Sequence, residues 1–400
     1  MPANDDISVK ILHKNTDISL VLGGPLYQFF RKAKLSGPAG EMLWRRIVAV
    51  TMVAWLPLPI LTLIGGQALH GIKVPFIYDV EAHVRFLIAL PVLIAAEVMV
   101  HYRLKPGIQG FVAQRIIDPG DMPKFLDAVE SARRLRNSNS LEFGLIVLVY
   151  VIGVWVWWNG VAVESASWFA TPGDSRFSLT LAGYWYAFVS IPIFQFILLR
   201  WYARFFIWSR FLWRVSRLKL RLLATHPDRA AGLGFLGLST YGFGPILFAQ
   251  GALLAGLIAS RVMYEGQDLL SFKMEAGAFV IAFVFLVFSP LFVFAPKLAR
   301  ARRRGLREYE RLGARYVDEF HQKWVCGGAP KGEDILGTGD IQSLADLGNS
   351  YNVVRETRPV PFAWTDVVRL AVSAAAPLIP LALTVLSLRE LVTKLVKIIF

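Results

Sequence analysis

The sequence predicts an all-α, polytopic integral membrane protein, and three observations support this prediction. The chain has a mean hydropathy of +0.49 and 55% hydrophobic residues, which is too apolar for a protein whose whole surface faces water. Several windows of about 20 residues carry almost no charge, and this length crosses a hydrocarbon core of roughly 30 Å. The windows lack the alternation of barrel strands, so we expect helices to satisfy the backbone polar groups within the lipid.

Seven apolar segments are candidate transmembrane helices. In chain order they are Ile47–Ala68, Arg85–Tyr102, Phe143–Val163, Leu179–Arg200, Phe243–Met263, Ala276–Pro296 and Val367–Leu388. Pro377 and Pro380 leave an alternative for the last segment, in which it forms a re-entrant hairpin instead of a full span. Its length favours a full span, whereas the basic residues of the tail behind it favour the hairpin.

The placement of Lys and Arg predicts the orientation of the chain. Of the 43 Lys and Arg residues, 35 fall into four segments on one side of the seven-span scheme and five fall on the other side. Because basic loops stay in the cytoplasm, the N-terminus is predicted to be cytoplasmic. The expected location is a cell membrane, and specifically a bacterial inner membrane.

This scheme divides the chain into a cytoplasmic N-terminal segment (1–46), a helical bundle (47–388) and an amphipathic C-terminal tail (389–400). The bundle includes three cytoplasmic loops, 103–142, 201–242 and 297–366. We expect helices at 122–138 with Asp121 as N-cap, at 340–356 with Asp340 as N-cap, and in a continuation of the sixth span that ends at Gly327-Gly328. We interpret these helices as a collar under the membrane, and a gate or a docking surface for a partner is the alternative.

Four arginines follow the fourth span at helical spacing. Arg210, Arg214, Arg217 and Arg221 are separated by 4, 3 and 4 residues, so they are expected to form one stripe on a helix. Tryptophans accompany them, as in an aromatic belt at a membrane interface. The stripe is therefore a candidate site for anionic lipid headgroups on the cytoplasmic side. This distribution also explains the net charge of +14, and nucleic acid is not an expected partner.

Glu97 is a carboxylate inside the second span, with His101 one helical turn further on. It lies six residues before Arg103, and so about 9 Å inside the predicted cytoplasmic edge of the span. A carboxylate at this depth is costly unless it faces protein or water, and it marks a functional site by default. Glu97 and His101 are therefore candidates for an ion or proton path, and an ion pair between Glu97 and Arg200 or Arg204 is the structural alternative.

Other motifs give little support for chemistry. Gly232, Gly234 and Gly237 match a dinucleotide fingerprint but lie between a basic helix and a membrane span, not in a βαβ unit. They are better interpreted as a turn where helices meet closely. The single cysteine and six scattered histidines predict no catalytic residues, no metal site and no cofactor.

These observations favour an ion channel or a transporter-like protein for a small solute. One carboxylate per chain suits a homo-oligomer, in which symmetry would repeat Glu97 around a shared pore. The alternative is a non-transporting membrane scaffold or signalling component that binds anionic lipid or a protein partner. A membrane enzyme is a third class, for which the spacing of residues identifies no catalytic group.

Overall fold

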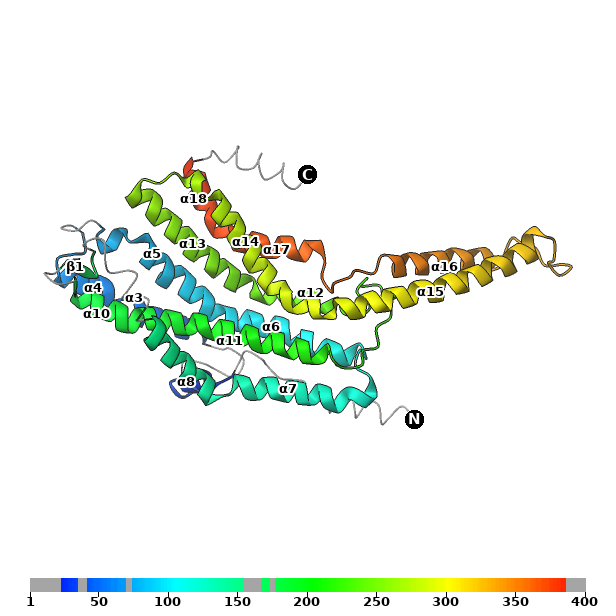
Figure 1. Ribbon diagram of the computed structural model, residues 1–400, viewed down its shortest axis with the longest axis horizontal. Coiled ribbons are helices and arrows are strands. Elements are labelled where there is room, and N and C mark those ends of the chain that lie inside the picture. Colours follow the sequence, from blue (N-terminus) through cyan, green and yellow to red (C-terminus); the bar gives the residue numbers. More distant parts are fainter. Residues whose placement is uncertain are drawn as a thin grey trace.

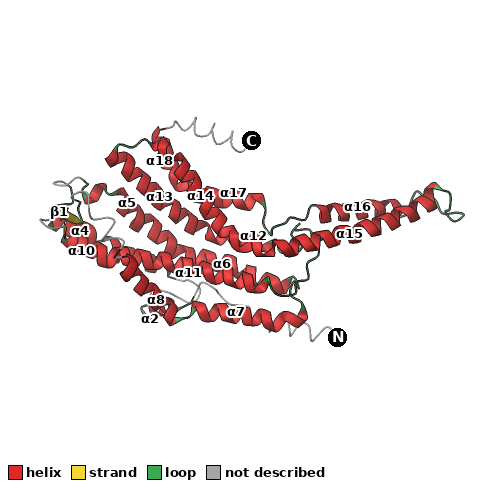
Figure 2. Cartoon of the chain, viewed as in Figure 1, coloured by secondary structure: helices red, strands yellow, loops and turns green. Residues whose placement is uncertain are grey.

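A computed structural model describes residues 23–34, 42–69, 74–153, 155, 167–172 and 177–385 of the chain. The described residues form long helices joined by short connections, with one small two-stranded sheet (Figure 2). The predicted C-terminal tail (389–400) and most of the predicted N-terminal segment lie outside the described residues. The prediction of an all-α membrane protein is confirmed.

The helices before the sheet are α2 (Pro25–Lys32), α3 (Leu43–Trp55), α4 (Pro57–Ile64), α5 (Val80–His83), α6 (Leu90–Ala113), α7 (Met122–Arg136) and α8 (Asn139–Leu148). The antiparallel strands β1 (Ala170–Pro172) and β2 (Phe177–Leu179) follow. The remaining helices are α10 (Leu181–Trp185), α11 (Ile191–Val215), α12 (Phe235–Ser239), α13 (Gly244–Glu265), α14 (Lys273–Phe288), α15 (Ala295–Phe320), α16 (Asp340–Arg355), α17 (Trp364–Ala375) and α18 (Ile379–Val385).

In the part of the chain that the structure describes, six helical segments are long and apolar enough to cross a membrane. They are Leu43–Ile64, Val80–Ala113, Leu181–Val215, Phe235–Glu265, Leu269–Val325 and Trp364–Leu383. Each contains or overlaps one predicted span, so six of the seven predicted spans are matched. The third predicted span begins in α8 and continues as a π-helical turn to Gly153. Most of its second half lies outside the described residues.

The last apolar segment continues through its prolines as one helical path. Helix α17 leads through a 3₁₀ turn (Ala376–Leu378) directly into α18. Proline lacks an N–H donor and its ring disfavours a regular α-helix, which accounts for the local 3₁₀ geometry at Pro377. Between Trp364 and Val385 the described chain does not reverse, so this part corresponds to the full-span alternative.

Helices α6 and α11 lie side by side at the centre of the bundle (Figure 1). Both helices carry large apolar side chains that are almost completely buried, among them Leu90, Leu93, Trp201 and Trp208. Helices α3 and α13 pack against α6, and α7 packs against α11. The two central helices bury three of their charged side chains, those of Glu97, Arg200 and Arg204.

Helices α15 and α16 form a long antiparallel arm that projects beyond the bundle (Figure 1). Gly305 brings them together at the base of the arm, because a Cβ there would lie 3.0 Å from Cγ1 of Val354. Towards the tip, the Asp340 carboxylate accepts hydrogen bonds from Lys323 Nζ and Trp324 Nε1, at 3.0 and 2.9 Å. The ion pair with Lys323 and the hydrogen bond from the Trp324 ring therefore hold the two helices of the arm together near its tip.

Asp121 occupies the predicted N-cap position of α7, but its side chain makes no capping hydrogen bond. The predicted cap role of Asp340 is wrong, because Gly339 is the N-cap residue of α16 and Asp340 is the first residue of the helix. At the start of neither helix does a backbone N–H group donate a hydrogen bond to the side chain of a capping residue. The Asp340 carboxylate is engaged at the arm tip. The Asp121 carboxylate instead pairs with Lys124 at 2.8 Å and accepts the backbone N–H of Lys219 at 2.8 Å. In both cases other partners engage the carboxylate in place of a capping N–H group.

The glycine-rich motif is a tight turn organised by Asp228. Its carboxylate accepts the backbone N–H groups of Ala230, Gly232 and Gly234, at 2.8, 3.1 and 2.8 Å. Gly232 has φ +94°, and a Cβ there would also lie 2.7 Å from Cδ1 of Ile116. Glycine is therefore required for both the backbone conformation and the close approach. This geometry fits the interpretation of the motif as a turn where parts of the chain meet closely.

Replacing Asp228 with Asn is expected to lower the free energy of unfolding by about 1–2 kcal/mol, because one oxygen acceptor becomes an NH₂ group facing the N–H of Gly234. Burial raises the pKa of Asp228, but the three backbone N–H bonds outweigh it and the net pKa is lowered. A lowered pKa in the folded state gives stability that is present above the unfolded pKa and is lost as the pH falls. Thermal unfolding between about pH 7 and pH 3 checks this, since the wild type should lose more stability than the variant. An equal loss in both proteins would contradict the assignment.

Candidate functional site

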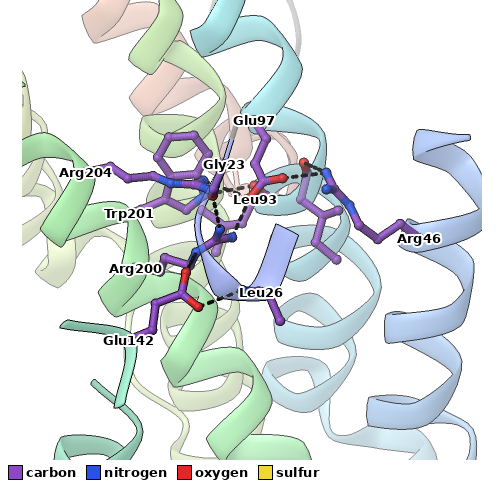
Figure 3. Close-up of polar contacts among 10 residues, drawn as sticks. Gly23, Leu26, Arg46, Leu93, Glu97, Glu142, Arg200, Trp201 and Arg204 are labelled. Atoms are coloured by element: carbon purple, nitrogen blue, oxygen red, sulfur yellow. Dashed lines mark hydrogen bonds and ion pairs between the residues drawn. The ribbon is translucent and has the colours of Figure 1, made fainter. Parts of the chain in front are cut away.

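Glu97 lies at the centre of an ion-pair cluster between α3, α6 and α11 (Figure 3). Its Oε1 accepts hydrogen bonds from Nη1 of Arg200 and from Nη1 of Arg204, both at 2.8 Å. Its Oε2 pairs with Nη2 of Arg46 at 2.7 Å. Glu97 is 6% exposed, and the three arginines are 3–7% exposed. Both carboxylate oxygens are therefore engaged inside the protein.

A second carboxylate extends the cluster towards the N-terminal segment. Arg200 Nε donates to Oε1 of Glu142 at 3.1 Å, and Arg200 Nη2 donates to the carbonyl oxygen of Gly23 at 3.1 Å. The backbone N–H of Leu26 donates to Oε2 of Glu142 at 2.7 Å. Arg200 thus joins α6 to the start of α8, and it also fastens the start of α2 to the bundle.

Backbone and aromatic contacts fix the arginine side chains. Arg46 also donates to the carbonyl oxygen of Ile94 at 3.4 Å, and the Arg204 guanidinium lies 5.0 Å from the centre of the Trp201 ring. Trp201 is itself held, because its Nε1 donates to the carbonyl oxygen of Leu93 at 2.9 Å. A planar guanidinium suits such combined ion pairing and stacking better than an ammonium group.

The charges of the cluster do not cancel. Three guanidinium groups face two carboxylates, so these five side chains carry a net positive charge. A buried ion pair is costly to form and much more costly to break, because breaking it leaves an uncompensated charge away from water. The arrangement therefore acts as a clamp that joins three helices at one depth.

The two candidates for an ion path both lie on α6, one helical turn apart. Glu97 lies in the cluster, and Arg200 and Arg204 are the partners that the sequence suggested for it. His101 lies one turn further along α6, where its ring is 5.3 Å from the ring of Tyr102. Arg46 and Glu142 complete the cluster, and the sequence interpretation included neither of them.

The predicted stripe of four arginines is not one helical stripe. Helix α11 ends at Val215, so it carries Arg210 and Arg214 but neither Arg217 nor Arg221. The chain leaves the helix because the N–H of Lys219 bonds to the Asp121 carboxylate and the N–H of Arg221 bonds to the carbonyl oxygen of Ile116. These long-range backbone bonds replace those that would have continued the helix.

The four arginines consequently have different environments. Arg214 Nη2 pairs with Oδ2 of Asp127 on α7 at 2.7 Å. The Arg217 guanidinium lies 4.9 Å from the centre of the Trp213 ring. Arg210 and Arg221 are exposed. The arginines predicted to form one stripe therefore differ in their contacts, and their binding of lipid headgroups stays a prediction.

The described residues contain no group of three or more His, Cys, Asp or Glu side chains that could hold a metal ion. The strongest polar constellation in the membrane-spanning region is therefore the Glu97 cluster, which is built from charge pairs. No protein-family model, curated protein or solved structure matches this chain. The geometry of its charged groups is the basis on which a function is proposed.

Proposed function

We propose that this multi-pass membrane protein is a non-transporting scaffold or signalling component that binds anionic lipid at its predicted cytoplasmic side. The observation that carries this proposal is the saturation of Glu97 by three arginines within one chain. A carboxylate on an ion path must exchange its partners with the passing ion. Here both oxygens are held, and a cation approaching the cluster would meet excess positive charge.

The position of Glu97 also argues against a ring around a shared pore. Such a ring requires each carboxylate to face the symmetry axis and the water along it. Glu97 points between α3 and α11 of its own chain and is 6% exposed (Figure 3). The charge pairs of this cluster support a structural role in joining helices.

The arm formed by α15 and α16 supports a scaffold in a second way. It extends well past the bundle (Figure 1), and the 57 residues of Leu269–Val325 correspond to roughly 85 Å of helix. A hydrocarbon core of roughly 30 Å accounts for only part of this length. The remainder is available to reach a partner at a distance from the membrane surface.

Ion flux in proteoliposomes tests the proposal. We expect no flux of monovalent cations, anions or protons above that of protein-free liposomes, either from the wild type or from Glu97→Gln. Liposomes that contain the channel peptide gramicidin are the positive control for cation flux. Flux from the wild type would overturn the proposal. A changed ion selectivity in Glu97→Gln protein that is still folded, as gel filtration and thermal unfolding would report, would also place Glu97 on the path.

A further inference from the structure

A large basic pocket lies between the segment that follows α11 and the first turns of α15. Its volume is about 800 Å³, and it is open on one side. Seven of its lining residues are basic, and no Asp or Glu is among the residues that line it. The basic residues are Arg217, Lys219, Lys297, Arg300, Arg303, Arg304 and Arg307. We call this site the basic pocket.

The shape of the pocket is fixed by contacts between its two walls. Lys297 Nζ donates to the carbonyl oxygen of Leu218, and Arg304 Nη2 donates to that of Leu222 at 3.3 Å. Ala301 is buried between these contacts. The basic residues of α15 recur at three- and four-residue intervals, so they share one face of the helix. The walls are therefore preorganised, and the charges converge on the space between them.

The positive charges of the pocket are poorly compensated within the protein. Among the described residues, the single ion pair formed by the seven is that of Arg304 with Glu308, at 3.8 Å. The nearby Asp121 carboxylate is occupied by Lys124 and by the backbone N–H of Lys219. Like charges held this close repel one another. An anion bound in the pocket would relieve this repulsion. A helix face that is simply exposed to solvent would not require such an anion.

The chemistry of the walls favours a phosphate group. Guanidinium groups bind phosphate oxygens through paired, charge-assisted hydrogen bonds. The volume lies within the range of roughly 300–1,000 Å³ that is usual for ligand pockets. Several cations in one pocket favour a ligand with more than one negative charge.

A mostly apolar groove adjoins the basic pocket and points to a lipid as the source of the phosphate. The groove has a volume of about 380 Å³, and Phe206, Trp213, Pro290 and Val293 are among its lining residues. Trp213 lines the groove while Arg217, stacked on its ring, lines the basic pocket. Exposed Phe206 lies on the membrane-spanning helix α11. An acyl chain in this groove would place its headgroup at the basic residues.

We propose that the basic pocket binds the phosphate headgroup of a multiply charged anionic lipid, with an acyl chain in the adjoining groove. This inference deepens the lipid binding of the proposed function. It does not depend on whether the bundle conducts ions, so its failure is distinguishable from a failure of the flux experiment.

Binding of dioctanoyl phosphatidic acid to the full-length protein in nonionic detergent tests the assignment. In Arg300→Gln/Arg303→Gln, neither replaced side chain has a hydrogen-bond partner among the described residues outside α15, so the fold should be retained. We expect its Kd to rise by about tenfold or more, the effect of losing charge-assisted bonds. Lys219→Gln, on the opposite wall, should weaken binding in the same direction.

The matched control is Arg311→Gln/Arg315→Gln, which removes the same charge from exposed positions further along α15. We expect its Kd to change by less than about twofold, since exposed charges at a distance contribute little. Equal weakening by both double variants would overturn the pocket in favour of diffuse attraction. Inorganic phosphate or glycerol phosphate binding as tightly as the lipid would overturn the lipid assignment and indicate a soluble phosphate ligand.

Discussion

Replacing Glu97 with Gln is expected to lower the free energy of unfolding by about 3–5 kcal/mol. The substitution nearly keeps the shape of the side chain but removes the negative charge that faces Arg46, Arg200 and Arg204. Only Arg200 would then keep a carboxylate partner within the cluster, Glu142, while Arg46 and Arg204 would lose theirs in a region that is almost closed to solvent. Thermal and denaturant unfolding of the detergent-solubilised protein measure the loss.

The matched control for this prediction is Glu130→Gln on α7. Glu130 also pairs with arginines, Arg133 at 2.6 Å and Arg134 at 3.3 Å, but these arginines are about half and three-quarters exposed. Solvent-exposed ion pairs contribute little to the free energy of unfolding, so Glu130→Gln should lose much less stability than Glu97→Gln. Similar losses in the two variants would show that Glu97 is not a clamp between helices.

A double-mutant cycle separates the clamp from a general loss of packing. Arg46 reaches Glu97 and the carbonyl oxygen of Ile94, so Arg46→Gln removes one partner of the carboxylate. The combined variant Glu97→Gln/Arg46→Gln should lose less stability than the two single losses added together, because each single change leaves a partner uncompensated. Additive losses would contradict direct coupling between the two residues.

The membrane spans could be predicted from the sequence because they depend on a local property. An uncharged segment of about 20 residues must place its backbone polar groups in a helix, whichever neighbours it has. Six of the seven predicted spans coincide with helical segments of sufficient length. The boundaries were less predictable, since α6 and α11 continue past the predicted apolar segments to Ala113 and Val215.

The Glu97 cluster could be predicted only in part. The depth of Glu97 in its span suggested Arg200 and Arg204, which lie at the end of a neighbouring span. Arg46 was assigned to the N-terminal segment, yet α3 begins at Leu43 and carries it towards Ile94. Glu142 directly precedes an apolar segment, and this position could have identified it as a further member of the cluster. Tertiary packing determines which helices lie beside one another, and the local sequence does not contain this information.

The arginines after α11 show the limit of periodicity. Their spacing fits a helix, and the residues around them have no strong helix breaker before Pro227. The helix nevertheless ends at Val215, because Asp121 and Ile116 offer backbone hydrogen bonds from another part of the chain. A local pattern cannot reveal a competing partner that is distant in sequence. The basic pocket exists as a result of this departure, since the segment after α11 forms one of its walls.

Gly251→Val is expected to lower the free energy of unfolding by at least about 3 kcal/mol, at the upper end of the effects of overpacking. A Cβ built on Gly251 would lie 2.0 Å from the carbonyl oxygen of Ala374, which is backbone and cannot rotate away. Close approach through small residues is how helices associate in lipid, where burial of apolar surface provides no driving force between them. Ser373 reinforces the contact by donating from Oγ to the carbonyl oxygen of Gly244 at 2.8 Å.

Gly277→Val on α14 is the matched control, because a Cβ there meets nothing within 4 Å. Glycine and valine differ by about 0.5 kcal/mol in helix propensity, in favour of valine, so the control should retain or slightly gain stability. Thermal unfolding of both variants measures the difference, and limited proteolysis at α17 reports whether that helix has separated from α13. If Gly251→Val unfolded like Gly277→Val, with α17 still protected, the two helices could not be as close as Gly251 and Ala374 place them. The last span would then be held to the bundle by its remaining contacts with α14, instead of by the backbone approach at Gly251.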